Sequence, residues 1–107
     1  MGKFDVSKQI NGDLHFNLKA DNGQVILTSQ GYSSRVNCDN GIDSVRKNSK
    51  KDSHFDRKIS TNDKHYFNLK AVNGLIIGTS EMYEAASSME TGIASVKKNA
   101  PKATVEG

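Results

Sequence analysis

The stretch FNLKADNGQVILTS at residues 16–29 occurs again, with four substitutions, as FNLKAVNGLIIGTS at residues 67–80. The match extends without a gap at a shift of 51 residues, and 20 of the 46 pairs from Phe4 to Ser49 are identical. Such self-similarity at a fixed spacing indicates that one structural unit is present twice. Two units are too few for a solenoid. We therefore expect a single domain with an internal pseudo-twofold axis, made of repeats 1–51 and 52–107.

Alternating polarity within this stretch predicts a strand with two different faces. Phe16 and Leu18 would share the buried face, while the polar residues between and after them would face outward. A second alternating segment precedes it in each copy, at residues 4–9 and 55–60. A short polar turn joins the two segments, so the sequence predicts an antiparallel hairpin in each repeat.

The Asn22-Gly23 pair then predicts a turn, because both residues tolerate positive φ angles. A two-residue turn would place Val25 and Leu27 on the face of Phe16. A three-residue turn with the glycine in a bulge would place Ile26 there instead, and this position is also Ile in the second copy. We favour the bulged turn, since an apolar residue that is unchanged between the copies is the better core candidate.

A helix is expected after the third strand of each repeat, over residues 33–47 and 84–98. Apolar residues recur in both segments with the i, i+4, i+7 spacing of one helical stripe. These residues are Cys38, Ile42 and Val45 in the first copy and Met89, Ile93 and Val96 in the second. The tail after Pro101 predicts one last strand.

The ends and glycines of these helices carry further predictions. Ser33 is the expected N-cap of the first helix, and Asn48 and Asn99 suit left-handed C-caps. Gly41 and Gly92 interrupt the helices at a cost of roughly 1 kcal/mol relative to Ala. We interpret them as points where the helix backbone closely approaches the sheet.

Composition agrees with a thin two-layer domain. The chain has 107 residues, 35% of them hydrophobic, and no Trp, so one modest core is expected. We predict an α+β fold with one mostly antiparallel sheet and two helices packed on one face. The net charge is +3. The single cysteine excludes an intrachain disulfide, and no segment suits a signal peptide or a membrane span, so we expect a soluble cytoplasmic protein.

The repeated segment, with the later GIxSVxKN, resembles the YegP-like family of small uncharacterised bacterial proteins over nearly the whole chain. The positions that carry this resemblance in the first copy are Leu18-Lys19-Ala20, Asn22-Gly23, Ile26, Thr28-Ser29, Tyr32, Gly41-Ile42, Ser44-Val45 and Lys47-Asn48. The resemblance implies tandem β(3)-α-β motifs that share one sheet and exchange their C-terminal strands. The Phe55 strand and the strand at residues 103–105 would each cross to the other half. It brings no known activity, cofactor or catalytic residue.

The residues themselves indicate no catalytic or metal chemistry. None of the three histidines is duplicated, so we expect no metal site and no cofactor. Cys38 falls on the apolar helical stripe and is expected in the core rather than as a nucleophile. Asp5 and Asp56 are the only duplicated acids, and both are expected on the outward side of a strand.

One duplicated polar set is a candidate binding surface, although the same side chains could simply support the fold. Its members are Asn17, Lys19, Asn68, Lys70, Tyr32 and Tyr83. Our first hypothesis is a small non-enzymatic binding or interaction domain that uses the helix-free sheet face. It would be a monomer with unknown partners and no membrane contact.

Two alternative functions stay open. The first is a weak, salt-sensitive nucleic-acid binder that uses Lys19, Lys70 and the basic runs at residues 46–51 and 97–102. The second is an enzyme with a site at the seam between the repeats. That hypothesis would require a pocket that contains titratable groups.

Overall fold

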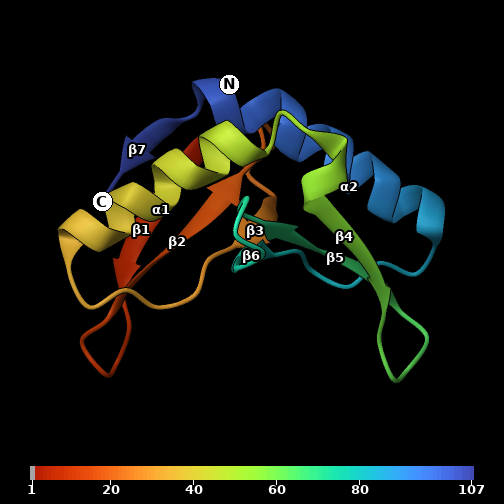
Figure 1. Ribbon diagram of the computed structural model, residues 1–107, viewed down its shortest axis with the longest axis horizontal. Coiled ribbons are helices and arrows are strands. Elements are labelled where there is room, and N and C mark those ends of the chain that lie inside the picture. The colour runs from red at the N-terminus through yellow and green to blue at the C-terminus, as the bar shows by residue number, and fades with distance from the viewer. Residues whose placement is uncertain (1) are drawn as a thin grey trace.

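In the computed structural model, which describes residues 2–107, seven strands form one sheet and two helices cover one of its faces (Figure 1). The strands are β1 (Lys3–Lys8), β2 (Leu14–Lys19), β3 (Val25–Thr28), β4 (Phe55–Ile59), β5 (His65–Lys70), β6 (Ile76–Thr79) and β7 (Thr104–Glu106). The helices are α1 (Arg35–Asn48) and α2 (Ala86–Asn99), and they are followed by the 3-10 turns η1 (Asp52–His54) and η2 (Ala100–Lys102). The predicted α+β class is confirmed.

The strand order, β4-β5-β6-β3-β2-β1-β7, shows how the two repeats are joined. After α1 the chain enters β4, which pairs with β5 of the second repeat. After α2 it enters β7, which pairs in parallel with β1 of the first repeat. All other strand pairs are antiparallel. The exchange of the C-terminal strands is thus confirmed, and each half of the sheet contains an edge strand delivered by the other half's helix.

The core lies between the helices and the inner sheet face. Its strand residues are the predicted apolar set of both copies, all at most 4% exposed: Phe4, Phe16, Leu18, Phe55, Phe67 and Leu69. Their phenyl rings pack edge to face in both repeats, with centroids 5.5 Å and 5.6 Å apart. Full burial of each such side chain contributes about 1.5–3 kcal/mol. The helices close this layer with their apolar stripes, in which Cys38 is fully buried as expected.

The hairpin between β2 and β3 has the predicted bulged turn. Gly23 has a φ of 84°, and its N–H donates to the carbonyl oxygen of Ala20 at 2.9 Å. Ile26 is buried as expected. The structure adds a second bulge, which brings Leu27 directly opposite Leu18 and buries it completely. The exclusion of Leu27 from the core was therefore wrong, because two neighbouring residues at a bulge can oppose one residue of the partner strand.

The seam between the repeats explains why Leu27 has no apolar counterpart. There β3 and β6 meet at one pair, Thr28 and Thr79. The residue equivalent to Leu27 is Gly78. A Cβ on Gly78 would lie 2.7 Å from Cγ and Cδ2 of Leu27, too close for any real contact. The leucine of one repeat thus occupies the space that a side chain of the other would need, which breaks the twofold symmetry at its axis.

The first half of α1 differs from the sequence prediction at its cap and at its glycine. Ser34, rather than Ser33, is the N-cap, and its hydroxyl accepts a hydrogen bond from the N–H of Asn37 at 3.2 Å. Gly41 does face the sheet, but its close neighbour is the side chain of Tyr32 rather than sheet backbone. A Cβ on Gly41 would overlap the Tyr32 hydroxyl. The glycine therefore makes room for a tyrosine ring, and α2 repeats this arrangement.

The C-terminal ends of the helices also correct a prediction. Asn48 and Asn99 are the last helical residues and are not left-handed caps, since the C-cap Ser49 has a φ of −65°. Their side chains instead turn back along the helix. The Nδ2 atom of Asn48 donates to the carbonyl oxygen of Ser44 at 2.8 Å, and that of Asn99 to the carbonyl oxygen of Ser95 at 2.9 Å. Each asparagine side chain thus donates to a carbonyl oxygen in the last turn of its helix, and each also lines a groove described below.

Candidate functional site

The helix-free face of the sheet carries a row of polar residues that runs across six strands. Each member is directly paired with the next: Asp5, Asn17, Thr28, Thr79, Asn68 and Asp56. These residues alternate along their strands with the buried apolar residues, which places them on the side opposite the helices. In Figure 1 the sheet arches below the helices, and the β1–β2 and β4–β5 turns project to either side of this face.

Hydrogen bonds within the row orient its two asparagines. Thr28 Oγ1 donates to Asn17 Oδ1 at 2.8 Å, and Thr79 Oγ1 donates to Asn68 Oδ1 at the same distance. The oxygen of each carboxamide is therefore used within the sheet. Neither Nδ2 atom forms a hydrogen bond with another residue between 2 and 107. The two amide groups are related by the pseudo-twofold axis but are not equally accessible, since Asn17 is half-buried and Asn68 is only 6% exposed.

The lysines of the candidate surface lie on this face but are paired with its acids. Lys19 Nζ is 2.9 Å from Asp5 Oδ2, and Lys70 Nζ is 3.0 Å from Asp56 Oδ2. The hydrogen bond from each lysine lowers the pKa of the carboxyl that it contacts. Both carboxyls are consequently ionised at neutral pH and neutralise the lysines beside them.

The two tyrosines of the candidate set lie elsewhere. The ring of Tyr32 stacks on Phe16 on the helix side of the sheet, with ring centroids 6.1 Å apart. Burial raises the pKa of Tyr32, and likewise that of Tyr83. The structure therefore divides the predicted set into four residues on the open face and two tyrosines that support the helices. Strand alternation could not place the tyrosines, because each follows its strand in an irregular segment.

The repeated Thr-Ser pair also divides in role. Ser29 lies at the end of β3, and its Oγ accepts a hydrogen bond from the buried N–H of Phe16 at 2.9 Å. The same contact joins Ser80 to Phe67 at 3.0 Å. Both serines are 7% exposed. They satisfy backbone groups of the central strands, which is a structural role.

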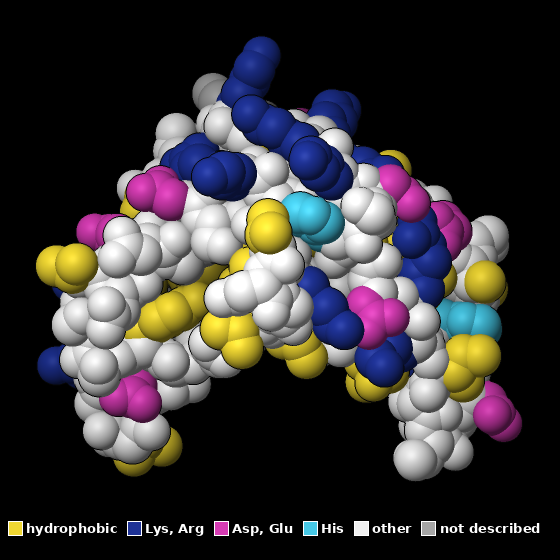
Figure 2. Space-filling view, viewed as in Figure 1, with side chains coloured by type: hydrophobic (Ala, Val, Ile, Leu, Met, Phe, Trp, Pro, Cys, Tyr) yellow, Lys and Arg dark blue, Asp and Glu magenta, His cyan; other side chains and the backbone are white. Residues whose placement is uncertain are grey.

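The two basic runs meet at the C-terminal ends of the helices. Arg46 of α1 donates through Nη1 to the carbonyl oxygens of Ala100 and Pro101, at 3.3 Å and 3.2 Å. Both helices end at the top of the molecule in Figure 1, and Figure 2 shows Lys and Arg side chains gathered over this region. We call this surface the lysine apex. We assign to it, by their positions at or just after the helix ends, Lys47, Lys50, Lys51, Lys98 and Lys102.

The lysine apex differs from the sheet face in its ion pairing. Among the described residues its five lysines form no side-chain hydrogen bond or ion pair, whereas the adjacent Lys97 contacts Asp52 at 2.7 Å. The negative ends of two helix dipoles favour cations at this position. The apex therefore concentrates unpaired positive charge from segments that are about half the chain apart.

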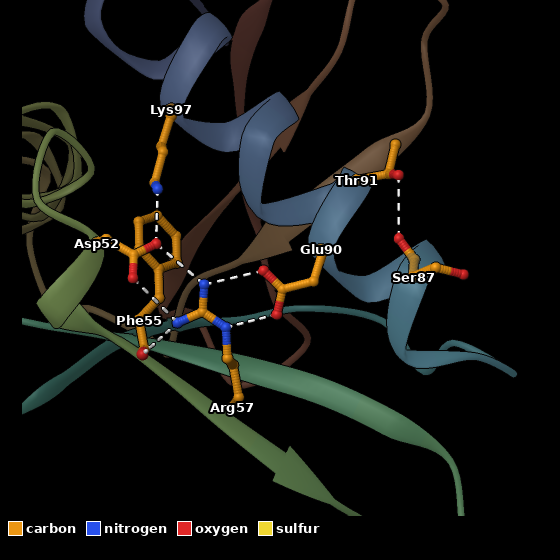
Figure 3. Close-up of polar contacts among 7 residues, drawn as sticks. All are labelled: Asp52, Phe55, Arg57, Ser87, Glu90, Thr91 and Lys97. Carbon is orange, nitrogen blue, oxygen red and sulfur yellow. Dashed lines mark hydrogen bonds and ion pairs between the residues drawn. The ribbon is translucent and has the colours of Figure 1, made fainter.

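A network of charged residues joins β4 to α2 (Figure 3). The guanidinium of Arg57 contacts Glu90 at 2.6 Å and 3.0 Å and Asp52 at 3.0 Å and 3.4 Å. Hydrogen bonds from Arg57 and Lys97 lower the pKa of Asp52 to about 2, and the Arg57 contact lowers the pKa of Glu90. In the first repeat the equivalent of Arg57 is Val6, on an edge that β7 covers. The network thus covers the outer edge of β4, to which no further strand is added, whereas β7 covers the corresponding edge of β1.

The seam contains a hollow of about 440 Å³, which was the place proposed for an enzyme site. Its lining is Thr28, Ser29, Gln30, Ile76, Gly78, Thr79 and Ser80. None of these side chains titrates between pH 2 and 12, so the hollow offers no acid or base for catalysis. Within the described part of the chain, no three of His, Cys, Asp and Glu are grouped so that they could hold a metal ion.

Two further hollows escaped the sequence reading. Each lies between the hairpin turn of one repeat and the helix of the other, with volumes of about 460 Å³ beside α1 and 380 Å³ beside α2. Five lining positions are identical in both. The α1 groove has Ser44, Lys47, Asn48, Ala71 and Asn73. The α2 groove has Ser95, Lys98, Asn99, Ala20 and Asn22. The signal was present in the duplicated residues, but Asn48 was predicted only as a helix cap and Lys47 only at a helix end and in a basic run, so neither indicated a groove.

Together these features define a class: a tandem-repeat α+β domain with polar and basic surfaces and no recognisable reaction centre among residues 2–107. Comparison with family models matches residues 10–56 and 60–106 to a domain of unknown function, DUF1508. Each match covers a hairpin, a helix and the beginning or whole of the exchanged strand. The chain belongs to this family.

Whole-chain relatives are equally uncharacterised. The UPF0339 protein YegP of Escherichia coli K12 is 50% identical over 98% of this chain and 96% of its own length. A UPF0339 protein of Acinetobacter baylyi is 47% identical over 98% and 95%. The solution NMR structure of E. coli YegP superposes with a TM-score of 0.93, covering 98% of this chain and 90% of that one. A UPF0339 protein of Shewanella oneidensis gives 0.92 at 44% identity, covering 98% and 89%. These relatives confirm the resemblance and the fold, and none has an assigned function.

Proposed function

We propose that this chain is a non-enzymatic bacterial binding domain, monomeric and cytoplasmic, that binds the phosphate backbone of nucleic acids through the lysine apex. The observation that carries this proposal is that five lysines without ion pairs lie in the segments where two adjacent helices end, over which Figure 2 shows Lys and Arg side chains gathered. Lysine side chains attract nucleic-acid phosphates and release condensed counterions when they bind. Such contacts position a protein on the backbone without reading base sequence.

The internal geometry favours the apex over the sheet face. Lys19 and Lys70 would have to leave Asp5 and Asp56 before they could contact a phosphate. The lysines of the apex need no such exchange. No helix among residues 2–107 has the length and apolar character that a membrane crossing needs.

The test is fluorescence anisotropy with a labelled 20-base-pair DNA duplex and a labelled 20-nucleotide RNA. Five phosphate contacts to the duplex predict a loss of about 500-fold in affinity between 50 and 200 mM salt. The variant Lys51→Glu/Lys102→Glu should bind at least about tenfold more weakly at 50 mM salt. The matched control, Lys8→Glu/Lys58→Glu, changes the net charge equally on strands β1 and β4. Absence of binding at 50 mM salt, or an equal loss in the control, contradicts the proposal.

The sheet face is a second candidate contact surface, because the Nδ2 atom of the half-buried Asn17 forms no hydrogen bond among residues 2–107, and the more deeply buried Asn68 repeats this arrangement. Amide NMR spectra recorded during the same titration separate the two surfaces. Shifts of the Asn17 and Asn68 side-chain amides, lost in Lys19→Glu/Lys70→Glu, would assign binding to this face. Shifts confined to residues 46–51 and 97–102 would assign it to the apex.

A further inference from the structure

The α1 and α2 grooves share their lysine, asparagines and serine but differ at their rims. Beside α1, the rim residues Val72 and Leu75 are 84% and 64% exposed. The equivalent positions beside α2 are Asp21 and Gln24. One groove therefore has an apolar rim, and its pseudo-symmetric counterpart has an acidic and polar one. Since the backbone framework is duplicated, the fold itself does not require exposed apolar residues at these positions.

A residue of helix α1 adds a third difference between the two grooves. Val36 lies one turn before Asn40, which lines the α1 groove, and the valine is 69% exposed. Residues spaced i, i+4 lie on the same helix surface. The equivalent of Val36 in α2 is Ser87. Three apolar side chains are thus exposed around one groove where the other has three polar ones. Clustered exposed apolar side chains with a polar surround mark interaction sites in soluble proteins.

The α1 groove is also long. The hollow that contains Lys47 and Val72 adjoins a second hollow of about 340 Å³ that contains Leu75, and the two share Ser44, Ala71 and Asn73. The two hollows together form an open channel along α1, with Lys47 at one end and, at the other, Leu75 and Ile77 among the polar residues Gln30, Asn37 and Asn40. Because its rim side chains are mostly exposed, the channel would leave a small molecule in solvent, whereas small-molecule sites bury most of the ligand. A protein segment that covers the rim suits this shape better.

The charge of the α1 groove indicates which kind of peptide segment it would bind. None of the ion pairs among residues 2–107 includes Lys47, which lines one end of the channel. The matching Lys98 of the α2 groove likewise makes no ion pair with a described residue, but a carboxylate, that of Asp21, lines the same hollow. We propose that the α1 groove binds an acidic amphipathic peptide segment of a partner protein. Its apolar side chains contact Val36, Val72 and Leu75, and a carboxylate contacts Lys47. This site shares Lys47 with the nucleic-acid surface proposed above and otherwise uses different residues.

The probe is a phage-displayed library of random dodecapeptides, selected against the whole protein at 150 mM salt. Enriched peptides should combine apolar residues with Asp or Glu, and their synthetic forms should bind measurably in anisotropy titrations. The variant Val72→Asp/Leu75→Gln gives the α1 groove the rim of the α2 groove and should weaken binding about tenfold or more. Both residues introduced already occupy equivalent positions in the other repeat. Equal melting temperatures will show that the fold is retained.

The duplication supplies two internal controls. Lys47→Gln should weaken peptide binding, whereas Lys98→Gln should leave it unchanged. The reverse exchange, Asp21→Val/Gln24→Leu/Ser87→Val, should create a second site and raise the calorimetric stoichiometry from one peptide per chain to two. The proposal is overturned if the library yields no enrichment or if the selected peptides bind Val72→Asp/Leu75→Gln as tightly as the parent. It is equally overturned if Lys98→Gln has the larger effect or the reverse exchange leaves the stoichiometry at one.

Discussion

Exchanging Leu27 and Gly78 tests how the two repeats fit at their seam. Leu27 is fully buried, and its side chain fills the space beside Gly78. Moving the leucine to the other repeat, in Leu27→Gly/Gly78→Leu, keeps the total volume and places the side chain at the pseudo-symmetric position. Gly78 has no positive φ, so its backbone accepts a leucine. We expect the exchange to restore most of the stability that either single substitution removes.

The magnitudes follow from the two single substitutions. Truncation of a buried leucine to alanine costs about 2–5 kcal/mol, and a glycine within a strand adds about 0.5–1 kcal/mol. Gly78→Leu brings two leucines into the same space, and overpacking of this kind costs about 1–3 kcal/mol. Independent effects would add to about 4–9 kcal/mol. The exchanged protein should instead lie within about 2 kcal/mol of the parent, because each leucine meets a glycine again.

Urea denaturation followed by far-ultraviolet circular dichroism measures all four proteins, and equal m-values would show that the unfolding transition is comparable. The coupling free energy is the difference between the double variant and the sum of the singles. A double variant whose loss of stability equals that sum would refute the reasoning. Leu27 and Gly78 would then be independent, and the asymmetry at the seam would have another origin.

Other perturbations test particular contacts. Gly41→Ala should lower the melting temperature although alanine favours helix by about 1 kcal/mol, because its Cβ displaces the Tyr32 ring; a rise would contradict this packing. Ser29→Ala should cost about 1–3 kcal/mol in chemical denaturation, since a buried N–H loses its acceptor. The depressed pKa of Asp52, about 2 when folded against 3.8 ordinarily, means that the unfolded chain takes up protons first. The stabilising contribution of the Asp52 contacts should therefore be fully present above about pH 4 and be lost as the pH falls toward 2. Arg57→Gln should flatten this decline, which melting curves recorded at different pH values will measure.

Much of the fold could be predicted from the sequence because the repeat lets one copy check the other. The alternation around Phe16 and Leu18, the Gly23 bulge and the helical stripes are local patterns that each copy repeats. Comparison of the copies failed where the fold itself is asymmetric. Leu27 was not predicted as a core residue, because its counterpart in the second repeat is Gly78. In the structure, the lack of a side chain at Gly78 leaves the space that Leu27 fills. A preference for unchanged residues cannot detect a complementary pair across a symmetry axis.

The candidate site was predicted less well, for a different physical reason. Strand alternation correctly placed Asn17 and Lys19 on the helix-free face, because this periodicity is local. It could not show that Lys19 reaches Asp5 or that the ends of the two helices meet. Those contacts depend on the strand order and on the path of the chain after each helix. Lys47 in particular has a plausible role at a helix end, which concealed its place in a groove built with the other repeat.

The parallel pairing of β7 with β1 has a mechanical consequence. The pair joins the two ends of the chain through three residue pairs, from Lys3–Thr104 to Asp5–Glu106. A force applied between the first and last residues would pull these strands along their length in opposite directions. It would load the hydrogen bonds between them together, in shear, rather than opening them one after another. β7, the shortest strand of the sheet, would thus provide through its pairing with β1 the main mechanical resistance to extension of the chain.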